Sequence, residues 1–285
     1  MDVKLREANA NDAATCGSIC YEAFKAIADE HNFPPDFPDR ETAVGLLAAM
    51  IENSGFYGVV AEAEGRIVGS NFLDERGSIM GIGPITVAPA VQNLAIGRRL
   101  MGAVLERAHR RGAAGISLVQ AGYHRRSLSL YLKLGFDVRE HLSCMQGPAI
   151  KESVPGVTVR PANDSDQDAC NRLCRRIHGH DRGGELRDAI RDGTARVAER
   201  AGRITGYTTQ VAFFAHTVAE TNDDLKALIG ASDRFAGPGF LAPSRNGELM
   251  RWCLSKGLRI VQPMTLMTIG LYNEPAGAWL PSVLY

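Results

Sequence analysis

Apolar residues recur along the chain with spacings that predict helices in some segments and strands in others. On the C-terminal side of Pro89, a helix is predicted by the four-residue spacing of Ile96, Leu100, Val104 and Ala108. Before it, the run from Ile85 to Val87 is stopped by Pro89, which predicts the end of a strand. The first N–H groups of a helix lack intrahelical partners and carry partial positive charge. Because the intervening loop contains the small residues Ala95 and Gly97, this junction predicts a cradle for a phosphate.

The same patterns predict alternating helices and strands through the first half of the chain. Helices are predicted from Asn11 or Asp12 to about Asp29 and over residues 40–53, and strands over residues 57–62, 67–73, 79–87 and 115–119. A further helix, over residues 127–134, ends at Gly135 and is followed by a strand over residues 136–139. Strands mixed with helices in this way predict an α/β chain with a mixed sheet.

Two short motifs together resemble the signatures of the GNAT superfamily of N-acetyltransferases. That family's loop reads Gln or Arg, two residues, Gly, one residue, and Gly or Ala; here Gln92, Ala95 and Gly97 fill these positions. The run Leu-Tyr-Leu-Lys-Leu-Gly-Phe, from Leu130 to Phe136, matches the second signature. Two positions depart from the family. Ala95 stands where glycine is usual, and we expect it to enter the helix with a negative φ. Ser127 stands where an asparagine commonly contacts the pantetheine arm.

The resemblance implies a mixed, mostly antiparallel sheet flanked by helices, and transfer of an acetyl group from acetyl-coenzyme A to an amine by direct attack. It implies that backbone groups of Ile85 and Val87 pair with pantetheine, that the loop holds the pyrophosphate, and that Tyr131 protonates the departing thiolate. Cofactor-binding residues are therefore predicted to be Ile85, Val87, Gln92, Asn93, Leu94, Ala95, Ile96, Gly97, Arg98, Arg99, Ser127 and Tyr131.

An alkylammonium must lose a proton before it can attack a thioester. Asp74 and Glu75, at the end of a strand predicted to neighbour the signature strand, are the first candidates for the base, with His31 and Asp36 as others. In the resembling family, the segment after the first helix covers the acceptor cleft. Its predicted substrate contacts here are His31, Phe33 and Phe37. We expect a small-molecule primary amine as acceptor; a peptide or protein acceptor, or a non-catalytic acyl-coenzyme A sensor, are the alternatives.

The second half of the chain repeats the opening of the first. Six residues recur 154 positions later: Arg6, Ala8, Asn9, Asp12, Cys16 and Cys20 correspond to Arg160, Ala162, Asn163, Asp166, Cys170 and Cys174. A later block, 61–69, recurs at 198–206, with an offset of 137, so the second copy is shorter by 17 residues (154 minus 137). After Pro243, which we match to Pro89 while matching Tyr272 to Tyr131, no counterpart of the loop precedes the next helix.

These observations predict two GNAT-like domains in tandem. The first, residues 1–147, binds acetyl-coenzyme A; residues 148–156 form a linker; residues 157–285 form a degenerate copy without the pyrophosphate loop. The second copy is expected either to shape the acceptor cleft or to form the interface of a homodimer.

Composition narrows the partners. Lys and Arg total 32, as do Asp and Glu, so no net field attracts nucleic acid or an anionic membrane, and neither partner is predicted. The charged N-terminus and the lack of a long apolar window favour a soluble cytoplasmic protein. The six cysteines are interpreted as small buried residues, and no metal is predicted.

Overall fold

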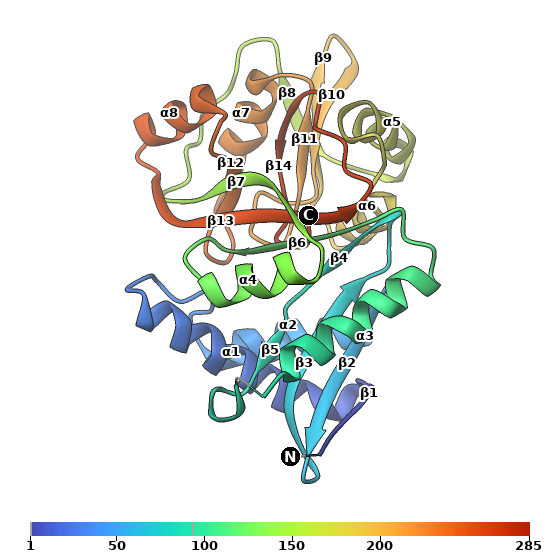
Figure 1. The fold of residues 1–285 in the computed structure, drawn as a ribbon. Helices are drawn as coiled ribbons and strands as arrows, with labels where there is room; N and C mark the ends of the chain where they lie inside the picture. Colours follow the sequence, from blue (N-terminus) through green and yellow to red (C-terminus); the bar gives the residue numbers. More distant parts are fainter. Residues whose placement is uncertain (1, 93) are drawn as a thin grey trace.

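The first half of the chain is built as strands and helices around one sheet (Figure 1) in a computed structural model that describes residues 2–92 and 94–285. Its elements are β1 (Val3–Glu7), the 3₁₀ turn η1 (Ala10–Asp12), α1 (Ala13–Glu30), α2 (Arg40–Glu52), β2 (Phe56–Ala63), β3 (Arg66–Asp74), β4 (Ile79–Ile82), β5 (Thr86–Val87), η2 (Pro89–Val91), α3 (Ile96–Arg110), β6 (Gly115–Ala121), α4 (Arg125–Lys133) and β7 (Asp137–Gln146).

The second half has a similar order of elements. They are β8 (Thr158–Pro161), η3 (Asp164–Asp166), α5 (Gln167–His178), α6 (Gly183–Arg191), β9 (Arg196–Arg200), β10 (Arg203–Thr208), β11 (Thr217–Ala219), α7 (Asn222–Gly230), β12 (Phe240–Pro243), α8 (Gly247–Ser255), β13 (Arg259–Gly270) and β14 (Ala278–Leu280). The predicted fold class is confirmed: a mixed sheet is flanked by helices, and a second, antiparallel sheet is consistent with two similar domains in tandem.

The internal repeat has a physical basis at the start of each copy. Arg6 donates to Asp12 at 2.7 Å (Nη1 to Oδ2), and Arg160 donates to Asp166 at the same distance. Each aspartate also forms a capping box with the asparagine three positions before it. The recurring residues therefore join the first strand of each copy to the start of its first helix.

The helix before the last long strand ends in the same way in both copies. Gly135 and Gly257, with φ of 92° and 85°, end α4 and α8. The N–H after each glycine donates to a helix carbonyl at 3.1 Å, that of Tyr131 in α4 and that of Cys253 in α8. The structural counterpart of Tyr131 is therefore Cys253, and the sequence match to Tyr272, which lies after β13, is wrong.

The two copies exchange their last long strands. The larger sheet has the order β1-β2-β3-β4-β6-β13-β7-β12, with β5 added on β3, and the smaller has the order β14-β11-β10-β9-β8. If each copy kept its own strand, β6 would pair with β7 and β12 with β13. Instead, β13 lies between β6 and β7, and β7 pairs with β12 (Figure 1). Strands before the expected linker at residues 148–156 thus pair with strands after it. The division of the chain into domains at that linker stays a prediction.

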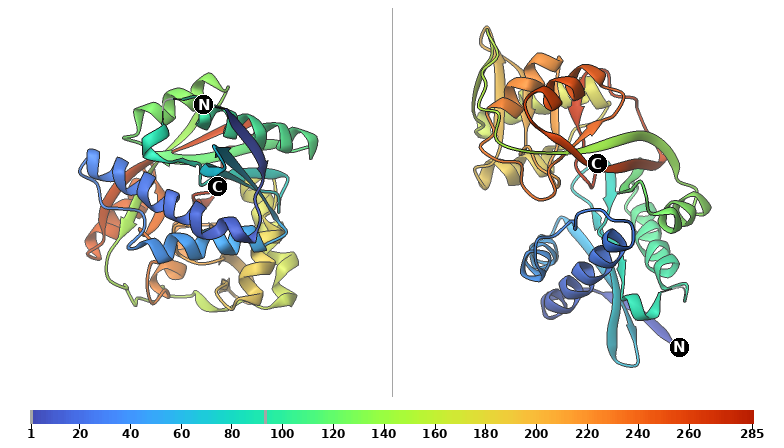
Figure 2. Two further views of the ribbon diagram at one scale, coloured as in Figure 1. Left: turned by 90° about the horizontal axis from the view of Figure 1, so that it is seen from below. Right: turned by 90° about the vertical axis from the view of Figure 1, so that its left-hand side faces the viewer.

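The signature strand is divided into β4 and β5. In β4, residues 79–81 pair in parallel with residues 115–117 of β6. Pro84 has no N–H to continue this ladder, and Thr86 and Val87 pair with β3 instead. The chain consequently diverges from β6 after Gly81. Figure 2 shows α1 and α2 on one side of this sheet and α3 and α4 on the other.

The C-terminal tail docks against the divergence. The carbonyl of Leu284 accepts a hydrogen bond from Ser117 Oγ at 3.3 Å, and Val283 N–H donates to the carbonyl of Phe213 at 2.8 Å. A Cβ on Gly81 would lie 2.1 Å from the Leu284 oxygen, so glycine is required for this approach. The tail therefore joins the second half to the centre of the larger sheet.

Candidate functional site

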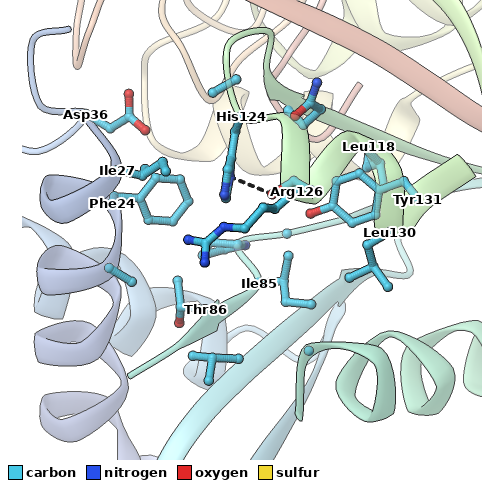
Figure 3. Close-up of a pocket in the computed structure, with 18 of the residues that line it drawn as sticks. Phe24, Ile27, Asp36, Ile85, Thr86, Leu118, His124, Arg126, Leu130 and Tyr131 are labelled. Atoms are coloured by element: carbon cyan, nitrogen blue, oxygen red, sulfur yellow. Dashed lines mark hydrogen bonds between the residues drawn. The ribbon is translucent and has the colours of Figure 1, made fainter. Parts of the chain in front are cut away.

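A cavity of about 920 Å³ lies where β5 and β6 separate (Figure 3). Its walls come from α1, the segment after α1, the residues around β5, the start of α3, the end of β6, and the length of α4. The second half adds the lining residues Phe213, Phe214, Met264, Val283 and Leu284. Its volume is in the range typical of small-molecule sites.

The N-terminus of α3 opens onto this cavity. No side chain of the described residues caps it, whereas the matching start of α8 is capped by Asn246, whose Oδ1 accepts from Leu249 N–H at 3.2 Å. Ile96 and Gly97, in the first turn of α3, line the cavity. The first copy therefore presents N–H groups for an anion, and the second copy uses the equivalent groups internally.

Ala95, at the N-cap of α3, has φ 60° and ψ 9°, which is left-handed. Our expectation of a negative φ there is wrong, because the residue makes the turn into the helix rather than belonging to it. An L-residue pays roughly 1–2 kcal/mol for this conformation, which explains why glycine is usual in the resembling loop.

Most of the predicted coenzyme residues gather at the cavity. Ile85, Val87, Gln92, Ala95, Ile96, Gly97, Arg98, Ser127 and Tyr131 line it. Leu94, with 54% of its surface exposed, and Arg99 do not, and Asn93 lies outside the described residues. Gln92 donates to the Val87 carbonyl at 3.1 Å and accepts from Arg126 at 3.1 Å. Arg98, Arg125, Arg126 and Lys133 make this end of the cavity cationic.

Tyr131 lies on the buried face of α4, 6% exposed, and its hydroxyl points into the cavity (Figure 3). Burial raises the pKa of this phenol to about 12, because the phenolate would lose its hydration. Its position at the cavity wall is what the resemblance predicts for a proton donor.

Asp74 and Glu75 do not line the cavity. Asp74 accepts from Arg76 at 2.6 and 2.8 Å, and Glu75 accepts from Arg107 at 2.6 Å. Arg76 also reaches Asp188 of α6 at 2.8 Å, so these charges fasten the end of β3 to the second half. Asp74 and Glu75 were predicted at the site because they are close to the signature strand in the sequence. Because that strand diverges from β6, the two residues lie at the end of the strand opposite the cavity.

The proline-rich segment contributes fewer contacts than predicted. Phe37, 6% exposed, lines the cavity, but His31 and Phe33 do not. Their rings lie against Tyr123 instead, at centroid distances of 5.3 and 4.1 Å. Tyr123 is itself a lining residue. His31 and Phe33 therefore support the cavity wall by packing against Tyr123.

Asp36, a secondary candidate for the base, does line the cavity. Its Oδ1 accepts from Gln262 Nε2 of β13 at 2.8 Å, and Tyr123 donates to Gln262 Oε1 at 3.4 Å. Burial raises the pKa of the Asp36 carboxyl, while the Gln262 hydrogen bond opposes that shift. A carboxylate in this setting has increased affinity for a proton.

Two polar lining residues were missed by the sequence reasoning. The Nε2 atom of His124 and both amide atoms of Gln120 are buried with no hydrogen-bond partner among the described residues. His124 Nδ1 lies 2.5 Å from Ser127 Oγ, and burial lowers the pKa of the imidazole to about 4. Ser127 thus orients a neutral histidine. Polar residues directly before the second signature were the available signal.

These features fit acetyl-coenzyme A. The uncapped N-terminus of α3 and the four cationic side chains suit phosphates. The diverged strand pair leaves room for an extended amide chain. The buried polar atoms without a partner among the described residues can form hydrogen bonds with a ligand. Across residues 2–92 and 94–285, no three His, Cys, Asp or Glu side chains are grouped to hold a metal ion. Within those ranges, no helix combines the length and apolar character that crossing a membrane requires.

Part of the chain matches a known protein family. Residues 21–136 match the acetyltransferase (GNAT) family. No curated protein matches the chain. Among solved structures, an acetyltransferase from Pyrococcus horikoshii is similar over 97% of this chain and 94% of its own, with 19% identity and a TM-score of 0.74.

Two further structures share the whole fold. A GCN5-related N-acetyltransferase from Sphaerobacter thermophilus is 16% identical over 95% of this chain and 96% of its own, with a TM-score of 0.60. A tandem GNAT protein from the clavulanic acid biosynthesis pathway is 16% identical over 99% of this chain and 100% of its own, with a TM-score of 0.57. At these identities the likeness shows the fold alone.

Proposed function

We propose that the chain transfers the acetyl group of acetyl-coenzyme A to the primary amine of a small molecule, because residues 21–136 match the acetyltransferase (GNAT) family. The transfer occurs in the cavity between β5 and β6. One observation carries the proposal: a single cavity holds the uncapped start of α3, the buried hydroxyl of Tyr131 and the carboxylate of Asp36.

The coenzyme end of the cavity is the cationic one. N–H groups at the start of α3 and the side chains of Arg98 and Arg126 are arranged to hold the phosphates. The Gln92 amide, fixed between the Val87 carbonyl and Arg126, keeps this loop against the strand end. Beyond Gly81 the chain no longer pairs with β6. The backbone groups around β5 on that side can therefore bind the pantetheine amides.

Bound acetyl-coenzyme A supplies a thioester whose carbonyl carbon accepts the amine and whose sulfur leaves. Tyr131 keeps its proton at neutral pH because its pKa is about 12. It can therefore donate a hydrogen bond to the departing sulfur and finally a proton, producing the free thiol. The new bond is the amide C–N bond, and the bond that breaks is the thioester C–S bond. The second proton that the nitrogen loses as the amide forms returns to the Tyr131 oxygen.

Asp36 takes the proton that the ammonium must lose. Its carboxylate faces the cavity from the α1 side, and burial raises its pKa toward that of a useful base. Gln262 holds one oxygen at 2.8 Å, leaving the other available to the amine. This assignment replaces Asp74 and Glu75, whose carboxylates are engaged by arginines away from the cavity.

A thiol-release assay with acetyl-coenzyme A and a panel of small primary amines tests the proposal. We expect amine-dependent thiol release together with an acetylated product of the matching mass. Coenzyme binding by calorimetry is measured in parallel. Binding without thiol release for any amine would overturn the proposal in favour of a sensor, and release only with peptide N-termini would overturn the small-molecule acceptor.

A further inference from the structure

The two faces of β6 divide the cavity into a coenzyme side and an acceptor side. Side chains alternate along a strand, so Leu118 and Gln120 face one way and Val119 and Ala121 the other. Leu118 belongs to the apolar core that contains α3 and Tyr131. Val119 and Ala121 pack with apolar residues of the second half. The acceptor side is therefore the side that the second half and α1 enclose.

The cationic and the anionic lining residues come from different elements. Every cationic residue of the described cavity lining belongs to α3 or α4: Arg98, Arg125, Arg126 and Lys133. From α1 and the segment after it come two carboxylates, Glu30 and Asp36. Among the described lining residues, the second half supplies no charged side chain. The elements that enclose the acceptor side thus supply carboxylates that can pair with an amine and no cation that would pair with a carboxylate.

The rest of the acceptor side is apolar. We define the acceptor basin as Phe24, Phe37, Phe213, Phe214, Met264 and Leu284, together with Asp36. Phe37, Phe213, Met264 and Leu284 are between 4% and 6% exposed. Phe24 packs edge-on against Phe37, and Phe213 against Phe214, with centroids 6.0 and 5.6 Å apart. Such walls suit a rigid apolar group.

We propose that the acceptor basin takes a primary amine with an apolar body and rejects the amino acid that carries the same body with a free carboxylate. This inference rests on the proposed function. The ammonium pairs with Asp36 while the body displaces water from the aromatic walls. A carboxylate on the adjacent carbon would be desolvated beside Asp36 with no cation to receive it, which opposes binding.

The second half is the source of this selectivity. Strand exchange places Met264 opposite Ala121 in the ladder between β13 and β6, and the docked tail brings Leu284 against the divergence. The same strand provides Gln262, which is 1% exposed and orients Asp36. A degenerate copy without an anion cradle therefore still builds the acceptor side of the first copy's site.

Three acceptors of matched shape test the proposal: 2-phenylethylamine, phenylalanine and phenylalanine methyl ester. The ester keeps the bulk at the adjacent carbon but removes the charge. We expect kcat/KM for the amine and the ester to exceed that for phenylalanine by about 100-fold or more, because burying an unpaired carboxylate is costly. Equal rates for phenylalanine and the amine would overturn the inference and leave the proposed function intact.

A variant in the basin gives a second measurement. Phe214→Ala should raise KM for 2-phenylethylamine about tenfold, while KM for ethylamine and the dissociation constant for coenzyme A stay within about twofold. An unchanged KM for 2-phenylethylamine would contradict the basin as the binding site of the apolar body. The absence of thiol release with every amine, despite bound coenzyme A, would overturn the proposed function itself.

Discussion

Single residues at this site act through burial rather than through exposed charge. Tyr131, Asp36 and His124 all have pKa values displaced by desolvation, and each lines the cavity. Asp74 and Glu75 were the more obvious candidates in the sequence, yet their carboxylates are engaged by arginines outside it. Burial is what makes a side chain sensitive to a ligand, because its unpaired polar atoms have no water to compensate them.

Substituting Tyr131→Phe removes the proposed proton donor while keeping the packed ring. We expect kcat to fall about 100-fold, in line with the loss of a general acid, with little change in the dissociation constant for coenzyme A. Steady-state kinetics and calorimetry measure the two quantities. Tyr57→Phe, a tyrosine on β2 outside the cavity lining, is the matched control. Full activity in Tyr131→Phe would remove the tyrosine from the mechanism.

Substituting Ala95→Gly tests the left-handed turn into α3. Glycine adopts φ 60° without the strain that alanine carries, so we expect the free energy of unfolding to rise by about 0.5–1 kcal/mol. Ala103→Gly, inside the same helix, should lower it by about the same amount. Chemical denaturation measures both. A loss of stability in both variants would show that Ala95 is not strained.

At the scale of elements, strand β13 connects the two copies by strand pairing and by a side-chain hydrogen bond at the site. It pairs with β6 on one side and β7 on the other, and it carries Gln262 to Asp36 across a sequence separation of 226 positions. The amide lowers the pKa of Asp36 against the effect of burial. We therefore regard Gln262 as a positioning residue for the proposed base.

Substituting Gln262→Leu removes the donor that opposes the burial shift, so the pKa of Asp36 rises further. Catalysis needs the ionised carboxylate, and activity falls as pH drops through that pKa. The acid limb of the kcat/KM profile should therefore move to higher pH by about one unit. Thr268→Val, on the same strand, loses the bond from Arg139 at 2.8 Å and should leave that limb in place. An unmoved limb in Gln262→Leu would contradict the positioning role.

At the scale of the whole molecule, the halves are held together by polar contacts and by the docked tail. Arg76 and Asn53 both bond Asp188 of α6, at 2.8 and 3.2 Å. Behind the tail, His178 lies edge-on to Trp279, with centroids 5.5 Å apart, and its Nδ1 is 3.4 Å from the Tyr285 hydroxyl. A histidine buried in these surroundings makes the assembly sensitive to acid.

Burial lowers the pKa of His178 well below 6.5, and His180, Arg182 and His216 lower it further. The unfolded chain therefore binds this proton first, and the stability that the neutral residue contributes is present above pH 6.5 and is lost as pH falls. Between pH 7 and pH 5 the loss should be about 2 kcal/mol. His178→Phe should lose less stability over that range than the parent, as thermal unfolding at the two pH values would show. An equal loss would place the acid sensitivity elsewhere.

Local patterns determined much of this protein in advance. The helices at Arg40–Glu52 and Ile96–Arg110, the strands around them and the glycine after α4 follow from periodicity and capping, which act between residues close in the chain. The repeat at Arg6 and Arg160 marked two copies of one fold, and the two signatures placed Gln92, Gly97 and Tyr131 at one site before any distance was known. Each of these inferences rests on spacing along a single segment.

Tertiary structure alone decided what faces the cavity from elsewhere. Whether Asp36 or Asp74 reaches it depends on where β4 leaves β6, and the presence of Gln262 and Leu284 depends on a strand exchange that neither copy announces in its own sequence. Pairing of strands far apart in the chain is selected by how well whole sheets bury their apolar faces. The outcome depends on the whole folded chain and not on any single segment. The acceptor side of the site could therefore be identified only from the tertiary structure.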